Sequence, residues 1–391
     1  MRMIGTAAAG VSNPNTRTKV DKMHFTVKRY DYPSQFAGIE AKVLHEIRDV
    51  LNSGAYILGN AVCEYERDFA AYIGTTHAIG VNSGTDALIL ALHALGVGPG
   101  DEVITVTNSF HATALAIVRV GAIPVLVDCD PDTFLIDLEQ VERKISTRTK
   151  AVIVVHLFGQ SVGMSTVHEL ARDCGLLVVE DCAQAVGALS GGKKVGSTSD
   201  AGCWSFAPSK NLSAAGDAGA ITLNNPEVAD RLRQMRHFGQ AAQNEHLFAG
   251  YNSRLDSIQA VVLRNKLARV DMWGAERARI ASIYKERLAD LPLAFQSGAE
   301  PGEHVYHLFQ VKTDFRDDLL SHLRKCGVDA VVRYPTPIHL QPAFVDLGYR
   351  SGDLPIAEGL AKQMLCLPLH PAMTPTQIDL VCDSMHSFFS G

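Results

Sequence analysis

The sequence predicts an α/β protein with a large domain, built on a mostly parallel, mixed sheet flanked by helices, and a smaller C-terminal α+β domain. Two observations carry this prediction. Short runs rich in β-branched residues alternate with helical runs between residues 103 and 223, which is the order of crossover units whose sheet is covered on both faces. The chain has 391 residues, more than one ordinary hydrophobic core accommodates, and this length favours two domains.

The first part of the chain is expected to be a flexible leader followed by helices. Residues 1–22 are small and polar and lack the apolar core of a signal peptide. Apolar residues recur at helical spacing over 41–52, and Gly54 then supplies a stop signal. A second helix carries Tyr65. We therefore expect the large domain to span 23–250, with a helical segment at its start.

The strands of the large domain are predicted from short apolar runs, each followed by a polar turn. Helical patterns at 110–120 and 165–174 lie between them. A small polar turn also feeds a helix that begins near Gly84. The predicted strands are 103–106, 124–127, 151–155, 176–180, 204–206 and 220–223.

A helical run from about 252 to 288 is expected to connect the two domains, as a segment spanning 251–290. The small domain then occupies 291–391. Its last helix opens with Thr374 and has Gln377 three residues later, the pattern of a capping box. The other predicted elements of this domain are strands at 305–311, 328–332 and 366–369 and a helix at 317–325.

Composition excludes several classes of function. The net charge is −6 and no block of basic residues is present, so neither a nucleic acid nor a membrane is an expected partner. No apolar run reaches the length of a membrane span. The eight cysteines are scattered without a C-x-x-C pair, which favours reduced thiols and a cytoplasmic protein. The 15 histidines form no metal-ligand pattern, and no metal is expected.

Candidate chemistry lies where predicted strands end. In an open α/β sheet, ligands bind outside the carboxyl ends of the strands. Asp181 ends one strand, and Lys210 follows another within a loop of small residues. Gly84 and Thr85 begin a helix, whose free N–H groups favour an anion such as phosphate. An acid, a lysine and a phosphate cradle are the parts that pyridoxal 5'-phosphate (PLP) requires.

Two glycine-rich stretches resemble nucleotide-binding motifs but do not match them. The glycine-rich stretch 96–100 follows a helix rather than a strand, so it does not match a dinucleotide loop. Residues 187–193 fit G-x-x-x-x-G-K, but Lys194 stands where that motif requires Ser or Thr. Both stretches are interpreted as turns.

With these residues in view, the chain resembles the DegT family of sugar aminotransferases, which are fold-type I PLP enzymes. The resemblance covers nearly all of residues 30–388. Each matching motif is weak alone, but their number and order are specific. The matching segments are 54–59, 83–88, 98–103, 155–160, 180–185, 205–212, 216–220, 250–256 and 334–339.

The resemblance implies a role for each matching residue of the cofactor site. Lys210 would form the Schiff base with PLP and shuttle a proton to and from the substrate carbon. Asp181 would pair with the pyridinium nitrogen, and Gln184 would bond the phenolic oxygen of the ring. Structural alternatives are a surface lysine, a helix cap and a surface glutamine, respectively.

The same resemblance implies that Gly84, Thr85 and Ser205 hold the phosphate and that Phe110 stacks on the ring. The alternatives are a simple cap or turn for the first three residues and a core aromatic for Phe110. Asn252 would reach the phosphate of the neighbouring subunit's cofactor, which implies a homodimer with shared active sites; a helix N-cap is the alternative.

Four further residues are candidates for the sugar-nucleotide side of the site: His304, His307, Tyr334 and His339. A histidine inside the run 305–311 could equally be a satisfied core residue.

The chain departs from the family pattern in positions that bear on the substrate. The family commonly has His two residues after the Gln-Ala of the acid motif, whereas Val186 and Gly187 follow Ala185 here. Ala207 replaces an aromatic residue before the proline of the lysine motif, and His111 stands where Ile or Val is usual. One branch of the family replaces the lysine by His and dehydrates sugars, and Lys210 argues against that branch.

The expected function is transamination of a nucleotide-linked keto-6-deoxyhexose, with L-glutamate as donor and pyridoxamine phosphate (PMP) as intermediate. The stretch 252–256 looks more like enzymes that aminate C3 than C4. Alternatives within the class are amination of a keto-cyclitol or synthesis of an aminohydroxybenzoate. A catalytically silent PLP-binding regulator is the alternative from another class, disfavoured by the intact set of Lys210, Asp181 and Gln184.

Overall fold

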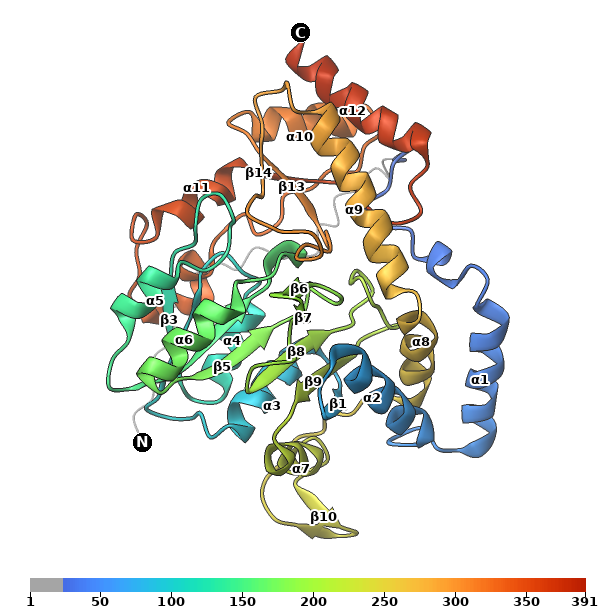
Figure 1. Ribbon diagram of the computed structural model, residues 1–391, viewed down its shortest axis with the longest axis vertical. Coiled ribbons are helices and arrows are strands. Elements are labelled where there is room, and N and C mark those ends of the chain that lie inside the picture. The colour runs from blue at the N-terminus through green and yellow to red at the C-terminus, as the bar shows by residue number, and fades with distance from the viewer. Residues whose placement is uncertain (1–23) are drawn as a thin grey trace, which may run out of the picture.

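A computed structural model describes residues 24–391 (Figure 1). The expected leader, 1–22, lies outside the described residues. The large sheet with its flanking helices forms the lower part of the molecule in Figure 1, and a smaller unit containing the C-terminus lies above it.

The large sheet has seven strands in the order β1-β9-β8-β5-β4-β2-β3. All pairs from β8 to β3 are parallel, whereas β9 is antiparallel to both β8 and β1. The sheet is therefore mostly parallel and mixed, as the sequence predicts. The strands are β1 (His77–Val81), β2 (Glu102–Val106), β3 (Ile123–Val127), β4 (Thr149–Val155), β5 (Leu177–Asp181), β8 (Ala201–Ser205) and β9 (Gly219–Leu223).

Consecutive residues of the strands enter different cores because side chains alternate across a sheet. Val103 and Val179 pack on one face with helices α3 and α7, while Ile104 and Val178 pack on the other with α5 and α6. Both faces are thus covered. These helices are α3 (Gly84–Ala94), α5 (Leu138–Lys144), α6 (Met164–Cys174) and α7 (Pro226–Met235), and α4 (Ala112–Arg119) follows β2.

The expected helical run between the domains is divided into two helices, α8 (Ser257–Leu267) and α9 (Val270–Arg287). The first packs with α2 (Asn60–Ile73) against Trp204 of the sheet, and also contacts α1 (Glu40–Ser53). The second rises into the upper unit in Figure 1.

The upper unit has a core of its own, to which α9, two further helices, two strands and Val27 from the start of the described chain contribute. The expected strand at 328–332 forms only isolated bridges, to Val27 and Cys366, so the prediction of a full strand is wrong there. The capping box of Thr374 and Gln377 is present. The elements are β12 (Ala294–Phe295), β13 (Phe309–Lys312), α10 (Arg316–Lys325), α11 (Pro355–Gln363), β14 (Met364–Leu367) and α12 (Pro375–Phe389).

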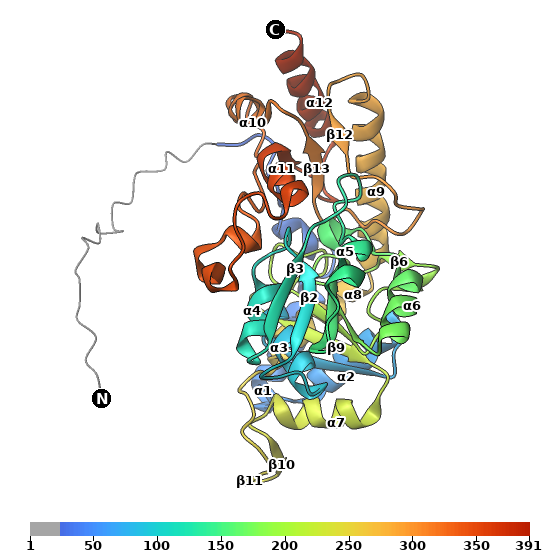
Figure 2. The same cartoon turned by 90° about the vertical axis from the view of Figure 1, so that its left-hand side faces the viewer.

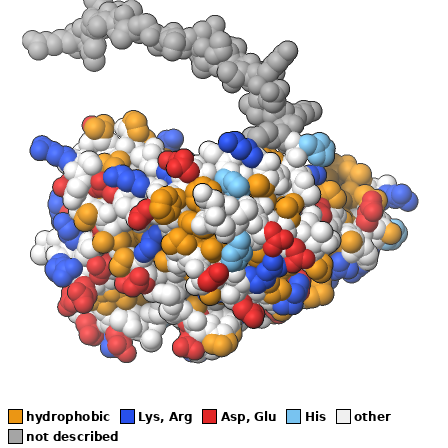
Figure 3. All heavy atoms as spheres, turned by 90° about the horizontal axis from the view of Figure 1, so that it is seen from above, with side chains coloured by type: hydrophobic (Ala, Val, Ile, Leu, Met, Phe, Trp, Pro, Cys, Tyr) orange, Lys and Arg blue, Asp and Glu red, His pale blue; other side chains and the backbone are white. Residues whose placement is uncertain are grey.

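Two small hairpins complete the fold: β6 (Leu189–Ser190) with β7 (Lys193–Lys194), and β10 (Gln240–Ala242) with β11 (Glu245–His246). The second hairpin projects from the lower end of the molecule beneath α7 (Figure 2). On the face seen in Figure 3, acidic and basic side chains are interspersed among apolar ones. Within residues 24–391, no helix combines the length and the apolar character needed to cross a membrane.

Candidate active site

A cavity of about 640 Å³ lies at the carboxyl ends of β5 and β8, beside the first turn of α3. This volume falls within the roughly 300–1,000 Å³ of small-molecule sites. Most of the residues singled out from the sequence line it, although they come from segments far apart in the chain. Those that line it are Gly84, Thr85, Phe110, Asp181, Gln184, Ser205, Lys210, His307 and Tyr334.

Asp181 is the last residue of β5 and is buried, with 7% of its surface exposed. Its Oδ2 accepts a hydrogen bond from the hydroxyl of Thr113 at 2.9 Å, and its Oδ1 accepts one from the Ala183 N–H at 3.2 Å. Burial raises the pKa of Asp181, while these two hydrogen bonds and the charge of Lys210 act against that rise. A cation brought next to this carboxylate would favour its ionised form further.

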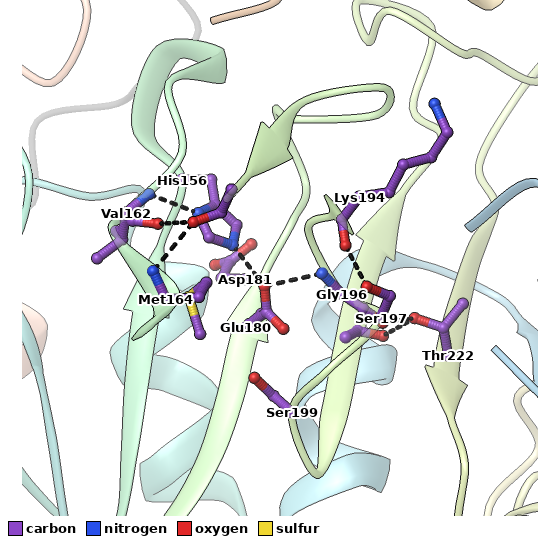
Figure 4. A network of polar contacts seen from close by, with 12 residues as sticks. His156, Val162, Met164, Glu180, Asp181, Lys194, Gly196, Ser197, Ser199 and Thr222 are labelled. Atoms are coloured by element: carbon purple, nitrogen blue, oxygen red, sulfur yellow. Dashed lines mark hydrogen bonds and ion pairs between the residues drawn. The ribbon is translucent and has the colours of Figure 1, made fainter. Parts of the chain in front are cut away.

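A buried network on the far side of β5 supports the acid (Figure 4). The Nδ1 of His156 accepts a hydrogen bond from the Val162 N–H at 3.0 Å, so its proton lies on Nε2, which is 2.9 Å from a carboxylate oxygen of Glu180. That oxygen also accepts the Gly196 N–H at 2.7 Å. The backbone N–H of His156 in turn donates to the carbonyl of Asp181 at 3.2 Å, which ties this network to the end of the strand.

Burial alone would raise the pKa of Glu180, but its hydrogen bonds from His156 and Gly196 hold that pKa below the usual value. The ligand-type atoms of His156, Glu180 and Cys182 lie within 4.8 Å of one another. The imidazole and the carboxylate of this group are already hydrogen-bonded to each other and to backbone N–H groups. We therefore describe the group as a hydrogen-bonded support rather than as a metal site.

Lys210 lies in the loop that joins β8 to β9. Burial lowers its pKa to about 8, with a contribution from the charge of Arg333 and against the attraction of Asp181. Burial and these two charges account for the shift, and no hydrogen bond contributes to it. The amine is thus present in its neutral, nucleophilic form to a larger extent than that of an ordinary lysine.

The first turn of α3 approaches the end of β8 closely. Ser83 caps this helix through a hydrogen bond from the Asp86 N–H, and Gly84 is its first residue. A Cβ at position 84 would lie 2.6 Å from the Cβ of Ser205, so only glycine fits there. The N–H groups at the start of α3 and the Ser205 hydroxyl therefore face the cavity together, a suitable arrangement for an anion.

Gln184 is fixed in orientation by two hydrogen bonds. Its Oε1 accepts the Phe158 N–H at 2.7 Å, and its Nε2 donates to the hydroxyl of Tyr334 at 2.8 Å. Tyr334 has a positive φ of 54°, a conformation that is strained for a tyrosine. Phe110 is 49% exposed and lines the cavity, so the alternative of a core aromatic does not describe it.

Three of the predicted site residues lie away from the cavity. His339 is buried between Thr107 (2.8 Å) and Glu358 (3.2 Å). His304 is buried and stacked on Tyr306, with its ring centroid 3.9 Å from the tyrosine's.

Burial lowers the pKa of His304 to about 3, so this ring stays neutral. Of the three histidine candidates for the substrate side, only His307 lines the cavity, where its Nδ1 is 3.2 Å from Oδ1 of Asn211. Asn252 is exposed and caps no helix; its backbone bridges to His237.

The structure adds residues that the sequence reasoning missed. Arg333, Tyr30 and Asp217 line the cavity, and Thr113 holds the acid. His111, noted in the sequence only as a departure from the family pattern, also lines it. The only available signal for Arg333 was its place directly before Tyr334. Tyr30 lay in a stretch without any motif.

The residues of the cavity fit PLP. A carboxylate, an amine with a lowered pKa and a helix N-terminus face one space, and the position nearest the helix start has no room for a side chain. These are the groups that the ring nitrogen, the aldehyde and the phosphate of the cofactor require.

Comparison with known proteins agrees with this geometry. The DegT/DnrJ/EryC1/StrS aminotransferase family matches residues 38–386. The chain belongs to this family. It is an aminotransferase, as the resemblance implied, and the expected fold-type I architecture is confirmed.

Two relatives illustrate the family. The chain is 42% identical over 359 residues to the dTDP-3-amino-3,4,6-trideoxy-alpha-D-glucose transaminase of Streptomyces venezuelae, covering 92% of this chain and 95% of that protein. It is 41% identical over 367 residues to a pleiotropic regulatory protein of Geobacillus stearothermophilus, covering 93% and 98%.

Among solved structures, DesV of S. venezuelae in complex with a ketimine intermediate matches with a TM-score of 0.91 and 42% identity. The match covers 93% of this chain and 98% of that one. Other similar structures hold the cofactor in its PMP and PLP forms. The cofactor of this aminotransferase is PLP.

Proposed function

We propose that this aminotransferase transfers the amino group of L-glutamate to the C3 keto group of a nucleotide-linked keto-6-deoxyhexose. The observation that carries the proposal is the convergence of Lys210, Asp181 and the start of α3 on one cavity. When bound there, PLP supplies an electron sink for the substrate carbon that loses or gains a proton.

In this proposal Lys210 holds the aldehyde carbon of the cofactor through Nζ and moves the proton at the substrate carbon. With a pKa of about 8, about a tenth of its amine is neutral at pH 7. For an ordinary lysine the neutral fraction is below about one in a thousand. The cavity thereby activates the nucleophile before any ligand enters.

The remaining residues of the site orient the cofactor. Asp181 would pair with the ring nitrogen and keep it protonated, and Thr113 holds the carboxylate in place. Gln184 faces the phenolic oxygen, and its amide cannot rotate because Phe158 and Tyr334 bind both ends of it. The start of α3 and Ser205 would hold the phosphate, and Phe110 would stack on the ring.

Support for amination at C3 comes from relatives. The S. venezuelae relative is named for a dTDP-linked 3-amino sugar. A relative from Acidithiobacillus ferrooxidans is named as the 3-aminotransferase of a UDP-linked 3-dehydro sugar. Nucleotide-linked sugars are therefore the substrate class that we propose. L-glutamate as donor rests on the family resemblance.

We further propose that two chains share each site through Asn252. Its side chain is exposed and does not line the cavity of its own chain, which leaves it available to a partner subunit. Lys210→Ala and Asn252→Ala variants would each lack an intact site. After mixing and subunit exchange, about a quarter of the sites would regain both residues. Recovery of about that fraction of activity supports sharing, and no recovery despite proven exchange would exclude it.

The central experiment is spectroscopic. The purified, PLP-loaded protein should absorb in the visible range, and L-glutamate should abolish that band while 2-oxoglutarate forms. Adding dTDP-, UDP- or GDP-linked 3-keto and 4-keto sugars should then restore it, which identifies the acceptor. A band that ignores L-glutamate would point to a silent regulator. A Lys210→Ala variant that still turns over would refute the assignment of the lysine.

A further inference from the structure

The active-site cavity contains a second cation, Arg333, that none of the roles above uses. Its guanidinium lines the same space as Lys210 and lowers the pKa of both Lys210 and His307 through its charge. In residues 24–391, no Asp or Glu carboxylate lies within 4.0 Å of its guanidinium, the distance of an ion pair. By contrast Arg29, next to Tyr30 in the chain, is paired with Asp329 at 2.9 Å.

The hydrogen bonds of Arg333 are also incomplete. One terminal nitrogen donates to the hydroxyl of Tyr30, while the buried Nε has no acceptor within the described chain. Arg333 is only half-buried as a residue, but its buried Nε is a donor without an acceptor and keeps its desolvation penalty. An anionic ligand in the cavity would remove that cost.

The backbone around Arg333 is held in a strained conformation. Tyr334, the next residue, has a φ of 54°, and its hydroxyl is bound by Gln184. Strained residues of this kind persist where the surrounding structure enforces them, and they cluster at ligand sites. Arg333 thus directly precedes a strained residue, and both line the same cavity.

The position of Tyr30 indicates in which direction the ligand extends. Tyr30 and Ser209 line both the active-site cavity and a neighbouring cavity of about 550 Å³. Arg333, bound to Tyr30, therefore stands where the two spaces meet. A ligand that extends from Lys210 toward the neighbouring cavity would therefore bring an anionic group to Arg333.

We propose that Arg333, oriented by Tyr30, is the residue that binds the anionic group of the substrate. This inference rests on the proposed function. A guanidinium group can bind two oxygens of a carboxylate or a phosphate at once. Two substrate groups present such oxygens, the carboxylate of the amino donor and the diphosphate of the sugar nucleotide. Both substrates would occupy the same cavity in turn, so one cation can serve either.

The test uses PLP-loaded protein and three probes that cannot react: glutarate, dTDP and UDP. Their affinities are measured by calorimetry for the wild type, Arg333→Gln, Arg333→Lys and Tyr30→Phe. Arg143→Gln is a matched control, because it removes the charge of an exposed arginine on α5. The visible absorbance of the cofactor reports whether the site of each variant remains intact.

Arg333→Gln should weaken at least one probe by about 10- to 100-fold, the loss expected for a charge-assisted hydrogen-bonded pair. Arg333→Lys should recover part of the loss, because it restores the charge without the planar fork. Tyr30→Phe should cause a smaller loss, and Arg143→Gln none. Weaker binding of glutarate identifies the donor carboxylate as the ligand, and weaker binding of the nucleotides identifies the diphosphate.

The inference fails if Arg333→Gln keeps the affinities of every probe within about twofold of wild type, or if the wild type binds none of the three. Failure of the proposed function has a different signature. It would appear in the wild type alone, as a protein that takes up no PLP or whose visible band does not respond to L-glutamate.

Discussion

Removing the amine of Lys210 should make the cofactor-free protein more stable, although we expect it to abolish activity. Lys210 lines the cavity and is partly exposed, but desolvation and the charge of Arg333 outweigh the attraction of Asp181 and lower its pKa from 10.5 to about 8. At about 1.36 kcal/mol per pH unit, this shift corresponds to about 3 kcal/mol of lost stability at pH 7. A Lys210→Met variant avoids that cost, so its free energy of unfolding should exceed that of the wild type by up to about 3 kcal/mol.

The gain should depend on pH with a defined sign. Below about pH 8 the lysine is charged in both the folded and the unfolded protein, so the full cost is present. Between about 8 and 10.5 the unfolded protein binds more protons than the folded one, and the stability of the wild type rises with pH. Above 10.5 both forms are neutral, and the advantage of the variant should vanish.

Lys266 offers a matched control. Burial lowers its pKa to about 8 as well, but its Nζ donates to Gln35 at 2.8 Å and to the carbonyl of Ser213 at 3.0 Å. Lys266→Met should gain no stability, because the lost hydrogen bonds leave buried acceptors unmet.

The assay is urea denaturation of the PLP-free proteins at pH 7 and at pH 10, at one protein concentration. A Lys210→Met protein less stable than the wild type at pH 7, or a difference that does not change with pH, would refute the reasoning.

Three further substitutions test the structure. Gly84→Ala places a Cβ 2.6 Å from that of Ser205 and should weaken PLP binding about tenfold or more, as measured by titration of the visible band. The control is Gly274→Ala, in an open place on α9, which should bind PLP as the wild type does. Glu180→Gln should lower the free energy of unfolding by about 2 kcal/mol, because a buried carboxylate that accepts hydrogen bonds from His156 and Gly196 is lost; unchanged urea unfolding would contradict this. Thr374→Ala removes the capping box of α12 and should cost about 1 kcal/mol, and a variant with an unshifted thermal unfolding midpoint would show that the cap contributes nothing.

Much of the fold follows from local patterns in the chain. The strands from β2 to β5 are short apolar runs between helical ones, and the capping box of α12 is readable from Thr374 and Gln377 alone. The strand β1 was not predicted, because its residues pair with a distant partner: His77–Val81 lies against β9, more than a hundred residues away. The small hairpins were not predicted because their strands are only two or three residues long, too short to show an alternating pattern. The break between α8 and α9 was also missed, since apolar residues continue across it.

The sequence by itself indicated the family and its cofactor, because Asp181, Lys210 and the start of α3 each follow a recognisable strand or turn. Only the tertiary structure decided which other side chains join them. Three histidines looked equally suitable, yet packing brings His307 to the cavity and buries His304 and His339 elsewhere. Arg333 and Tyr30 are about three hundred residues apart and meet through a hydrogen bond. No local pattern encodes such a contact, since it depends on how two segments far apart in the sequence pack against each other.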